Sequence, residues 1–276
     1  MDRPPSRFAP IAEALLLAAT FLGAGLTSGV FGHAAIGVPL VLDIRDRPTP
    51  PPSTSAASAP AAEARENITA GESPPSEIPL AALPSHVFLD VPFTSQAPFG
   101  DWGEPYQDAC EEASVAMAMA WVRGRTITPR EADAEILGQV SYERYYFGYH
   151  RDTALRETLK LFTRYYQYPA VAIVLDITVA DVRGALAAGN LVLLPAAGKL
   201  LGNPYYAQPP LYHMVVVVGY DDEAEEFIVH DPGTRRGKNF RYKYDTLWNA
   251  VHDWTGDPKT ILGGEKAMIV VAPPVE

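Results

Sequence analysis

Residues 211–231 of this 276-residue chain read LYHMVVVVGYDDEAEEFIVHD, and this stretch decides the fold. Two apolar runs separated by an acidic turn predict two antiparallel strands, one beginning at His213 and the other ending at Asp231. Side chains alternate along a strand, so His213 is expected on the same face as Val215 and Val217. The domain is therefore expected to be built on an antiparallel sheet.

His213 and Asp231 are predicted to be neighbours on one face of that sheet. If the turn is centred near Asp222, the two residues lie directly opposite each other, with Cβ atoms about 5 Å apart. A carboxylate beside an imidazole fixes its tautomer and stabilises the imidazolium, which is the orienting role in a nucleophile–base–orienter triad. A structural His–Asp pair at the sheet end is the alternative, and a slip of one residue would separate the two side chains.

Cys110 is the only cysteine, which excludes an intrachain disulfide and a site with several thiolates. The apolar residues that follow it recur with helical period, which predicts a helix capped by Asp108 with Cys110 in its first turn. The helix dipole there favours a thiolate, and Glu111 and Glu112 need not face the sulfur. A lone Cys is otherwise a small buried apolar residue. If His213 acts as a base, the interpretation of Cys110 as a nucleophile is favoured over that of a buried apolar residue.

The rest of the domain is predicted to be α+β, with helices first and then mostly sheet. The segment Thr128–Glu131 (TPRE) has the pattern of a capping box with proline in the first turn. Further helices are expected at 153–165, 178–189 and 245–254, and further strands at 87–93, 191–195 and 267–271.

A thiolate attack creates an oxyanion, which requires preorganised donors. The backbone N–H of Cys110 is one candidate, and a side-chain amide of Gln96 or Gln107 is the second. His150, like the other histidines away from the 211–231 hairpin, has no acidic partner at ligand-like spacing, and no Gly-rich phosphate loop follows a strand. His230 is expected to point to the other face of the sheet, in a structural or surface role. We therefore expect no cofactor and no metal.

Residues 1–45 are predicted to be a membrane anchor, because residues 14–42 carry no Asp, Glu, Lys or Arg. Arg3 and Arg7 before the run are typical of a cytoplasmic N-terminus, which would place the domain outside the cytoplasm. A cleaved signal peptide, and hence secretion, is the alternative. Residues 46–85 are rich in Pro, Ala and Ser and predict a disordered linker, and residues 86–276 form the folded domain. The net charge of −11 argues against a nucleic-acid partner.

Four features in this order resemble the C39-like branch of the papain-like cysteine peptidases. They are VPFTSQ at 91–96, a Cys at a helix start, YHMVVVVGYD at 212–221 and VHDPG at 229–233. The resemblance implies a papain-like fold, in which an N-terminal helix carrying the Cys packs on an antiparallel sheet. It also implies Cys110 as nucleophile, His213 as base, Asp231 as orienter and Gln96 as oxyanion donor. The loop before Cys110 is longer than usual in such enzymes, and GluGlu follows the Cys.

The function expected from these observations is that of a membrane-tethered cysteine peptidase acting on peptide or protein substrates. The same triad could serve a cell-wall or isopeptide amidase or transferase, because specificity depends on loops rather than on the triad. A non-catalytic C39-like binding module is the other alternative.

Overall fold

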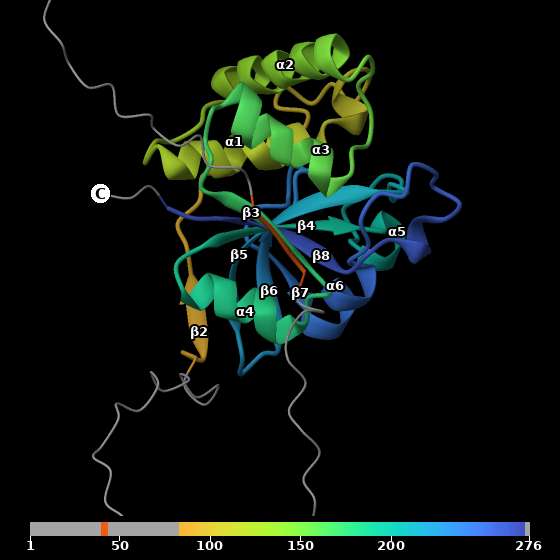
Figure 1. Ribbon diagram of the computed structural model, residues 1–276. Coiled ribbons are helices and arrows are strands. Elements are labelled where there is room, and N and C mark those ends of the chain that lie inside the picture. The colour runs from red at the N-terminus through yellow and green to blue at the C-terminus, as the bar shows by residue number, and fades with distance from the viewer. Residues whose placement is uncertain (1–39, 44–82, 274–276) are drawn as a thin grey trace, which may run out of the picture. The chain divides into compact units, whose positions relative to one another are not determined.

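The computed structural model describes residues 40–43 and 83–273, whose strands form one sheet (Figure 1). The strands are β1 Leu40–Asp43, β2 His86–Phe88, β3 Val171–Leu175, β4 Leu191–Ala196, β5 His213–Asp221, β6 Glu226–His230, β7 Phe240–Lys243 and β8 Ala267–Val271. Their order is β1-β3-β8-β4-β5-β6-β7, with β2 beside β5. All neighbours are antiparallel except β1 and β3. The expected antiparallel sheet is confirmed.

Helices lie on both faces of this sheet (Figure 1). They are α1 Cys110–Val122, α2 Pro129–Tyr146, α3 Leu155–Lys160, α4 Val179–Ala187, α5 Gly198–Leu201 and α6 Tyr244–Ala250. Helices α1 and α3 pack on one face, with α2 behind them, whereas α4 and α6 cover the other face. The helix that carries the cysteine therefore packs on the sheet, as predicted.

Strand β5 shows why the sheet is buried on both sides. Met214 and Val216 belong to the apolar cluster under α1, whereas Val215 and Val217 belong to the cluster under α4 and α6. All four are fully buried, and burial of each such side chain contributes roughly 1.5–3 kcal/mol. The alternation inferred for this strand is confirmed, and it places its first residue, His213, at one end of the sheet.

Of two predicted helix caps, one is confirmed and the other is wrong. At α2, Thr128 Oγ1 accepts the Glu131 N–H at 3.3 Å, and the Glu131 carboxylate accepts the Thr128 N–H at 2.8 Å, so the capping box is confirmed. At α1 the cap is Ala109, without a side-chain hydrogen bond, so the prediction of an Asp108 cap is wrong. Asp108 ends a short 3₁₀ turn, and its carboxylate accepts a hydrogen bond from the Gln107 side chain instead.

The helix expected at 153–165 is interrupted. It begins at Leu155, and after Lys160 its hydrogen bonds widen into a π-helical turn over Leu161–Tyr165. The expected strand 87–93 is limited to β2, His86–Phe88.

The predicted anchor and linker lie outside the described residues, apart from 40–43 and 83–85. Residues Leu40–Asp43, at the end of the apolar run, form β1 beside β3. Among the helices of the described residues, none has the length and apolar character needed to cross a bilayer.

Candidate active site

A β-bulge decides how His213 and Asp231 meet. Next to the turn, Asp221 pairs with Glu226, but the register shifts between Val217 and Gly219 so that Val217 pairs with Val229. Continued to the strand end, this register places Asp231 diagonal to His213, so the predicted direct pairing is wrong by two residues. An even shift keeps both side chains on one face, and His213 Nε2 lies 2.8 Å from Asp231 Oδ1.

The Asp231 carboxylate is fully buried and saturated with donors. Its Oδ2 accepts hydrogen bonds from the hydroxyls of Tyr206 and Tyr242, both at 2.6 Å, and from Asn203 Nδ2 at 2.9 Å. Its Oδ1 accepts the Gly233 N–H at 3.0 Å in addition to the His213 contact. Four partners besides the imidazole fix the position of this carboxylate.

These contacts determine the charge of Asp231. Burial alone would raise the pKa of Asp231, but the neighbouring His213 and the hydroxyls of Tyr206 and Tyr242 outweigh it and lower this pKa to about 2. Asp231 is therefore an anion at neutral pH, next to the imidazole of His213.

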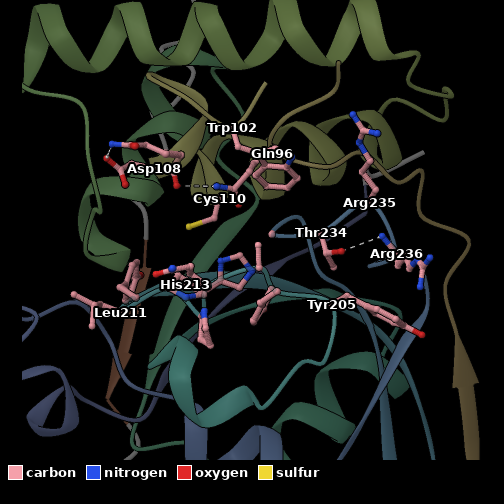
Figure 2. A pocket seen from close by; sticks show the side chains of 18 of the residues that line it. Gln96, Trp102, Asp108, Cys110, Tyr205, Leu211, His213, Thr234, Arg235 and Arg236 are labelled. Carbon is pink, nitrogen blue, oxygen red and sulfur yellow. Dashed lines mark hydrogen bonds between the residues drawn. The ribbon is translucent and has the colours of Figure 1, made fainter. Parts of the chain in front are cut away.

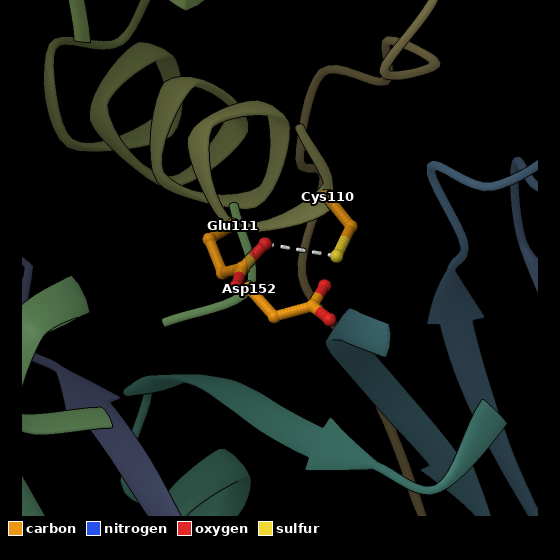
Figure 3. Close-up of side chains that lie close together, drawn as sticks. All are labelled: Cys110, Glu111 and Asp152. Atoms are coloured by element: carbon orange, nitrogen blue, oxygen red, sulfur yellow. Dashed lines mark hydrogen bonds between the residues drawn. The ribbon is translucent and has the colours of Figure 1, made fainter. Parts of the chain in front are cut away.

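Cys110 is the first residue of α1 and is 3 % exposed. Its Sγ donates a hydrogen bond to Glu111 Oε2 at 3.0 Å, and Asp152 lies beside both groups (Figure 3). The other Glu111 oxygen accepts the Thr153 N–H at 2.6 Å, which holds this carboxylate next to the sulfur. Contrary to expectation, the adjacent glutamate does face the thiol.

The groups around Cys110 keep its thiol protonated. Burial and the nearby carboxylates of Glu111 and Asp152 raise the pKa of Cys110 well above its ordinary value. Burial also raises the pKa of Asp152, to about 7, with a further contribution from Asp108. The effect of these acidic groups opposes that of the helix dipole.

Cys110 and His213 line one cavity of about 1320 Å³ (Figure 2). The acidic groups Asp108 and Asp152 belong to its wall, and so do the basic groups Arg235 and Arg236. Further lining residues are Gln96, Trp102, Tyr205, Leu211 and Thr234. The structure thus brings together a thiol, an imidazole with an anionic partner, and a polar cleft.

The model of the Peptidase_C39 like family matches residues 88–256, more than half of the chain. The chain belongs to this family. Membership supports a cysteine-type peptidase as its enzyme class. No curated protein matches the sequence.

Solved structures similar to this C39-like chain include two bacterial proteins. One is described as a putative C39-like peptidase from Bacillus anthracis, with 15 % identity and a TM-score of 0.45 over 69 % of this chain and 99 % of that one. The other is xylellain, a cysteine protease from Xylella fastidiosa, with 16 % identity and a TM-score of 0.45 over 74 % of this chain and 91 % of that one.

The two glutamine candidates of this C39-like domain have different surroundings. Gln96 is buried, and its Nε2 donates to the carbonyls of Tyr106 at 2.8 Å and Gln107 at 2.9 Å. Gln107 donates through Nε2 to the carboxylates of Glu104 and Asp108. Both side chains line the cavity, but both N–H groups of the Gln96 amide already have acceptors. An oxyanion would have to replace one of those carbonyls.

Sequence reasoning missed the partners that complete this C39-like site. Asn203, Tyr206 and Tyr242 approach Asp231 from a loop and from β7, and no local pattern marks them. His230 takes the structural role foreseen for it, since its Nε2 donates to the Val91 carbonyl at 2.8 Å. Asp152 lies beside the thiol although the two residues are far apart in the chain.

Proposed function

We propose that this chain hydrolyses peptide bonds of peptide or protein substrates with Cys110 as nucleophile, His213 as base and Asp231 as orienter. The observation that carries the proposal is the 2.8 Å contact between His213 Nε2 and Asp231 Oδ1 at the wall of the cavity that also contains Cys110. Because Asp231 occupies Nε2, Nδ1 is the nitrogen left to exchange a proton with the sulfur.

The chemistry follows from these positions. His213 Nδ1 takes the thiol proton as Cys110 Sγ bonds to the carbonyl carbon, and the anionic Asp231 stabilises the resulting imidazolium. Collapse of the tetrahedral intermediate breaks the C–N bond, and the imidazolium gives its proton to the leaving amine. Water then attacks the thioester by the same route in reverse, which frees the acid product and the thiol. In the resting site the Sγ–H bonds to Glu111, so the side chain must turn from Glu111 to His213 first.

The oxyanion would be held by the backbone N–H of Cys110 and by the Gln96 amide. Gln96 is favoured over Gln107 because Gln96 is buried, whereas Gln107 is exposed and its amide donates to the carboxylates of Glu104 and Asp108. Binding of the carbonyl oxygen would take one Gln96 N–H from the Tyr106 or Gln107 carbonyl.

Substrate cleavage tests the triad directly. Incubation with a peptide library and mass spectrometry should reveal cleavage by the wild type and none by Cys110→Ala or His213→Ala. His213→Ala should also slow the labelling of Cys110 by iodoacetamide, because the imidazole is the group that takes up the thiol proton. Wild-type protein that cleaves nothing, with a labelling rate that does not depend on His213, would leave a binding module. Cleavage of peptidoglycan fragments but of no peptide would favour the amidase.

We further propose that residues 14–39 anchor the chain in a membrane with the catalytic domain outside the cytoplasm. The absence of charged side chains in this run and the preceding Arg3 and Arg7 support it. In cell fractions the full chain should sediment with membranes and resist extraction by high salt, and external protease should cleave its domain in spheroplasts. A secreted protein whose mature N-terminus follows the run would indicate signal-peptide cleavage instead.

A further inference from the structure

A second cluster of ligating side chains lies on the α1–α2 side of the domain, outside the triad. Glu112 belongs to α1, Glu143 to α2, and His150 to the segment after α2. One ligating atom from each lies within 4.8 Å of the other two, and His150 Nε2 is 2.8 Å from Glu112 Oε1. All three side chains are 1 % exposed. A histidine and two carboxylates thus converge in the interior.

The carboxylates in this cluster lack the partners that a buried anion requires. Neither oxygen of Glu143 accepts a hydrogen bond from the described residues, and Oε2 of Glu112 accepts none either. The described ion pairs give Glu112 a single basic partner, His150, and Glu143 none. An uncompensated carboxylate in such a position is costly, so Glu143 must hold a proton or a cation must lie next to it.

We propose that Glu112, Glu143 and His150 bind a divalent transition-metal ion of the Zn²⁺ class, which ties α1, α2 and the following segment together. Two carboxylates neutralise the ion, and the neutral imidazole is its third ligand, so the buried group carries no net charge. An imidazole with carboxylates is a donor set that suits Zn²⁺, whereas Ca²⁺ and Mg²⁺ prefer oxygen ligands alone. Atoms that are each bound about 2.0–2.2 Å from one ion lie within 4.8 Å of one another, as these three ligating atoms do.

The site is distinct from the group around the thiol. Cys110, Glu111 and Asp152 form another convergent set, and a thiolate is itself a strong zinc ligand. A metal titration of the wild type would mix the two sets. The test therefore uses the full chain with Cys110→Ala, which removes the sulfur and leaves the three proposed ligands intact.

The Cys110→Ala protein is stripped with a chelator, dialysed and titrated with Zn²⁺ by calorimetry, and bound metal is counted by mass spectrometry. We expect one Zn²⁺ per chain and a rise in Tm of roughly 10 °C when Zn²⁺ is about a thousandfold above Kd. Co²⁺ in its place should give visible d–d bands without a thiolate charge-transfer band. Stripped protein that binds no Zn²⁺ and does not change in Tm would overturn the proposal and leave Glu143 as a proton-bearing acid.

Glu143→Gln in the same background tests the assignment of the ligands. This isosteric change removes the charge and should weaken Zn²⁺ binding by roughly 100-fold or more. Glu223→Gln, at an exposed position in the turn between β5 and β6, is the matched control and should bind like its parent. If Glu143→Gln does not fold, His150→Asn serves as the second variant. Affinity in the folded variant equal to that of the control would rule out this set of ligands.

Discussion

His213 and Asp231 share a face of the sheet because β5 contains a bulge between Val217 and Gly219. At the turn, Asp221 pairs with Glu226, and that register continued without a shift would place the two side chains on opposite faces. One extra residue in β5 changes the offset from odd to even. The 2.8 Å contact between His213 Nε2 and Asp231 Oδ1 therefore depends on this irregularity near the middle of the strand.

The first prediction concerns Gly219, which follows the bulge. A Cβ at this position would lie 2.2 Å from the backbone carbonyl oxygen of Val87 in β2, a contact that only backbone movement can relieve. Gly219→Ala should therefore lower the free energy of unfolding by about 1–3 kcal/mol, measured by urea denaturation. Gly184→Ala in α4, where nothing lies within 4 Å of the new methyl, is the control and should be neutral or stabilising. Equal stability of the two variants would contradict the close approach of β2.

The second prediction concerns Asp231→Asn. An amide cannot orient and stabilise the imidazolium of His213 as a carboxylate does, so kcat/KM for a cleaved peptide should fall on the order of 10³–10⁴-fold. Fluorogenic peptide hydrolysis measures this, with circular dichroism to show that the variant is folded. A loss of less than tenfold in a folded variant would argue against the orienting role.

The lowered pKa of Asp231 also predicts how the free energy of unfolding changes at acidic pH. Folding lowers the pKa of Asp231 from 3.8 to about 2, so its anion stabilises the folded state. This contribution, about 2 kcal/mol, is fully present above pH of about 4 and is lost as the pH falls toward 2. In urea denaturation at a series of pH values, Asp231→Asn should therefore lose less stability than the wild type over this interval. Parallel curves would show that Asp231 titrates at its ordinary pKa.

Local patterns predicted those parts of the fold whose determinants lie close together in the chain. The capping box at Thr128 is present, helix α4 begins just after Thr178, and β8 begins at Ala267 and ends at Val271 as expected. Periodicity also assigned His213 and Asp231 to one face. That result came from an incorrect register, because hydrophobic alternation does not reveal the bulge between Val217 and Gly219, where β2 also pairs with β5.

The site depends more on long-range contacts, which the sequence does not display. The side chain of Glu111 turns toward the sulfur because Thr153 holds its other oxygen, and Thr153 is far along the chain. Glu112, Glu143 and His150 meet only after α1 and α2 pack, so no ligand-like spacing marks them. Strand β7 went unrecognised, although its Tyr242 donates a hydrogen bond to Asp231. Residue types marked Cys110, His213 and Asp231 as candidates, whereas packing decides which partners they have.

The third prediction uses Gly233, whose N–H donates to Asp231. A Cβ here would lie 2.8 Å from His213 Cε1 and 3.0 Å from His213 Nε2, so Gly233→Ala should displace the imidazole. We expect kcat to fall by roughly tenfold to a hundredfold with a smaller change in KM, because positioning of the base affects the chemical step. Steady-state kinetics on one peptide, with Gly184→Ala as the control, would measure this. An unchanged kcat would show that the ring accommodates the methyl.

The fourth prediction concerns the carboxylate beside the thiol. In Glu111→Gln, the amide oxygen can still accept the Thr153 N–H, so the segment around it should keep its conformation. The carboxyl acceptor 3.0 Å from Cys110 Sγ is lost, however, and this lowers the pKa of the thiol. Each unit by which this pKa falls increases the thiolate fraction tenfold, so iodoacetamide should label Cys110 about tenfold faster at pH 7.

Glu223→Gln, with its exposed position in the β5–β6 turn, is the charge-matched control for this measurement and should label at the wild-type rate. Both variants replace one carboxyl group by an amide, so a difference between them reports the contact with the sulfur rather than the net charge of the protein. Equal acceleration in both would assign the effect to the net charge. An unchanged rate in Glu111→Gln would show that burial alone keeps Cys110 protonated, and that the hydrogen bond to Glu111 does not hold the sulfur away from His213.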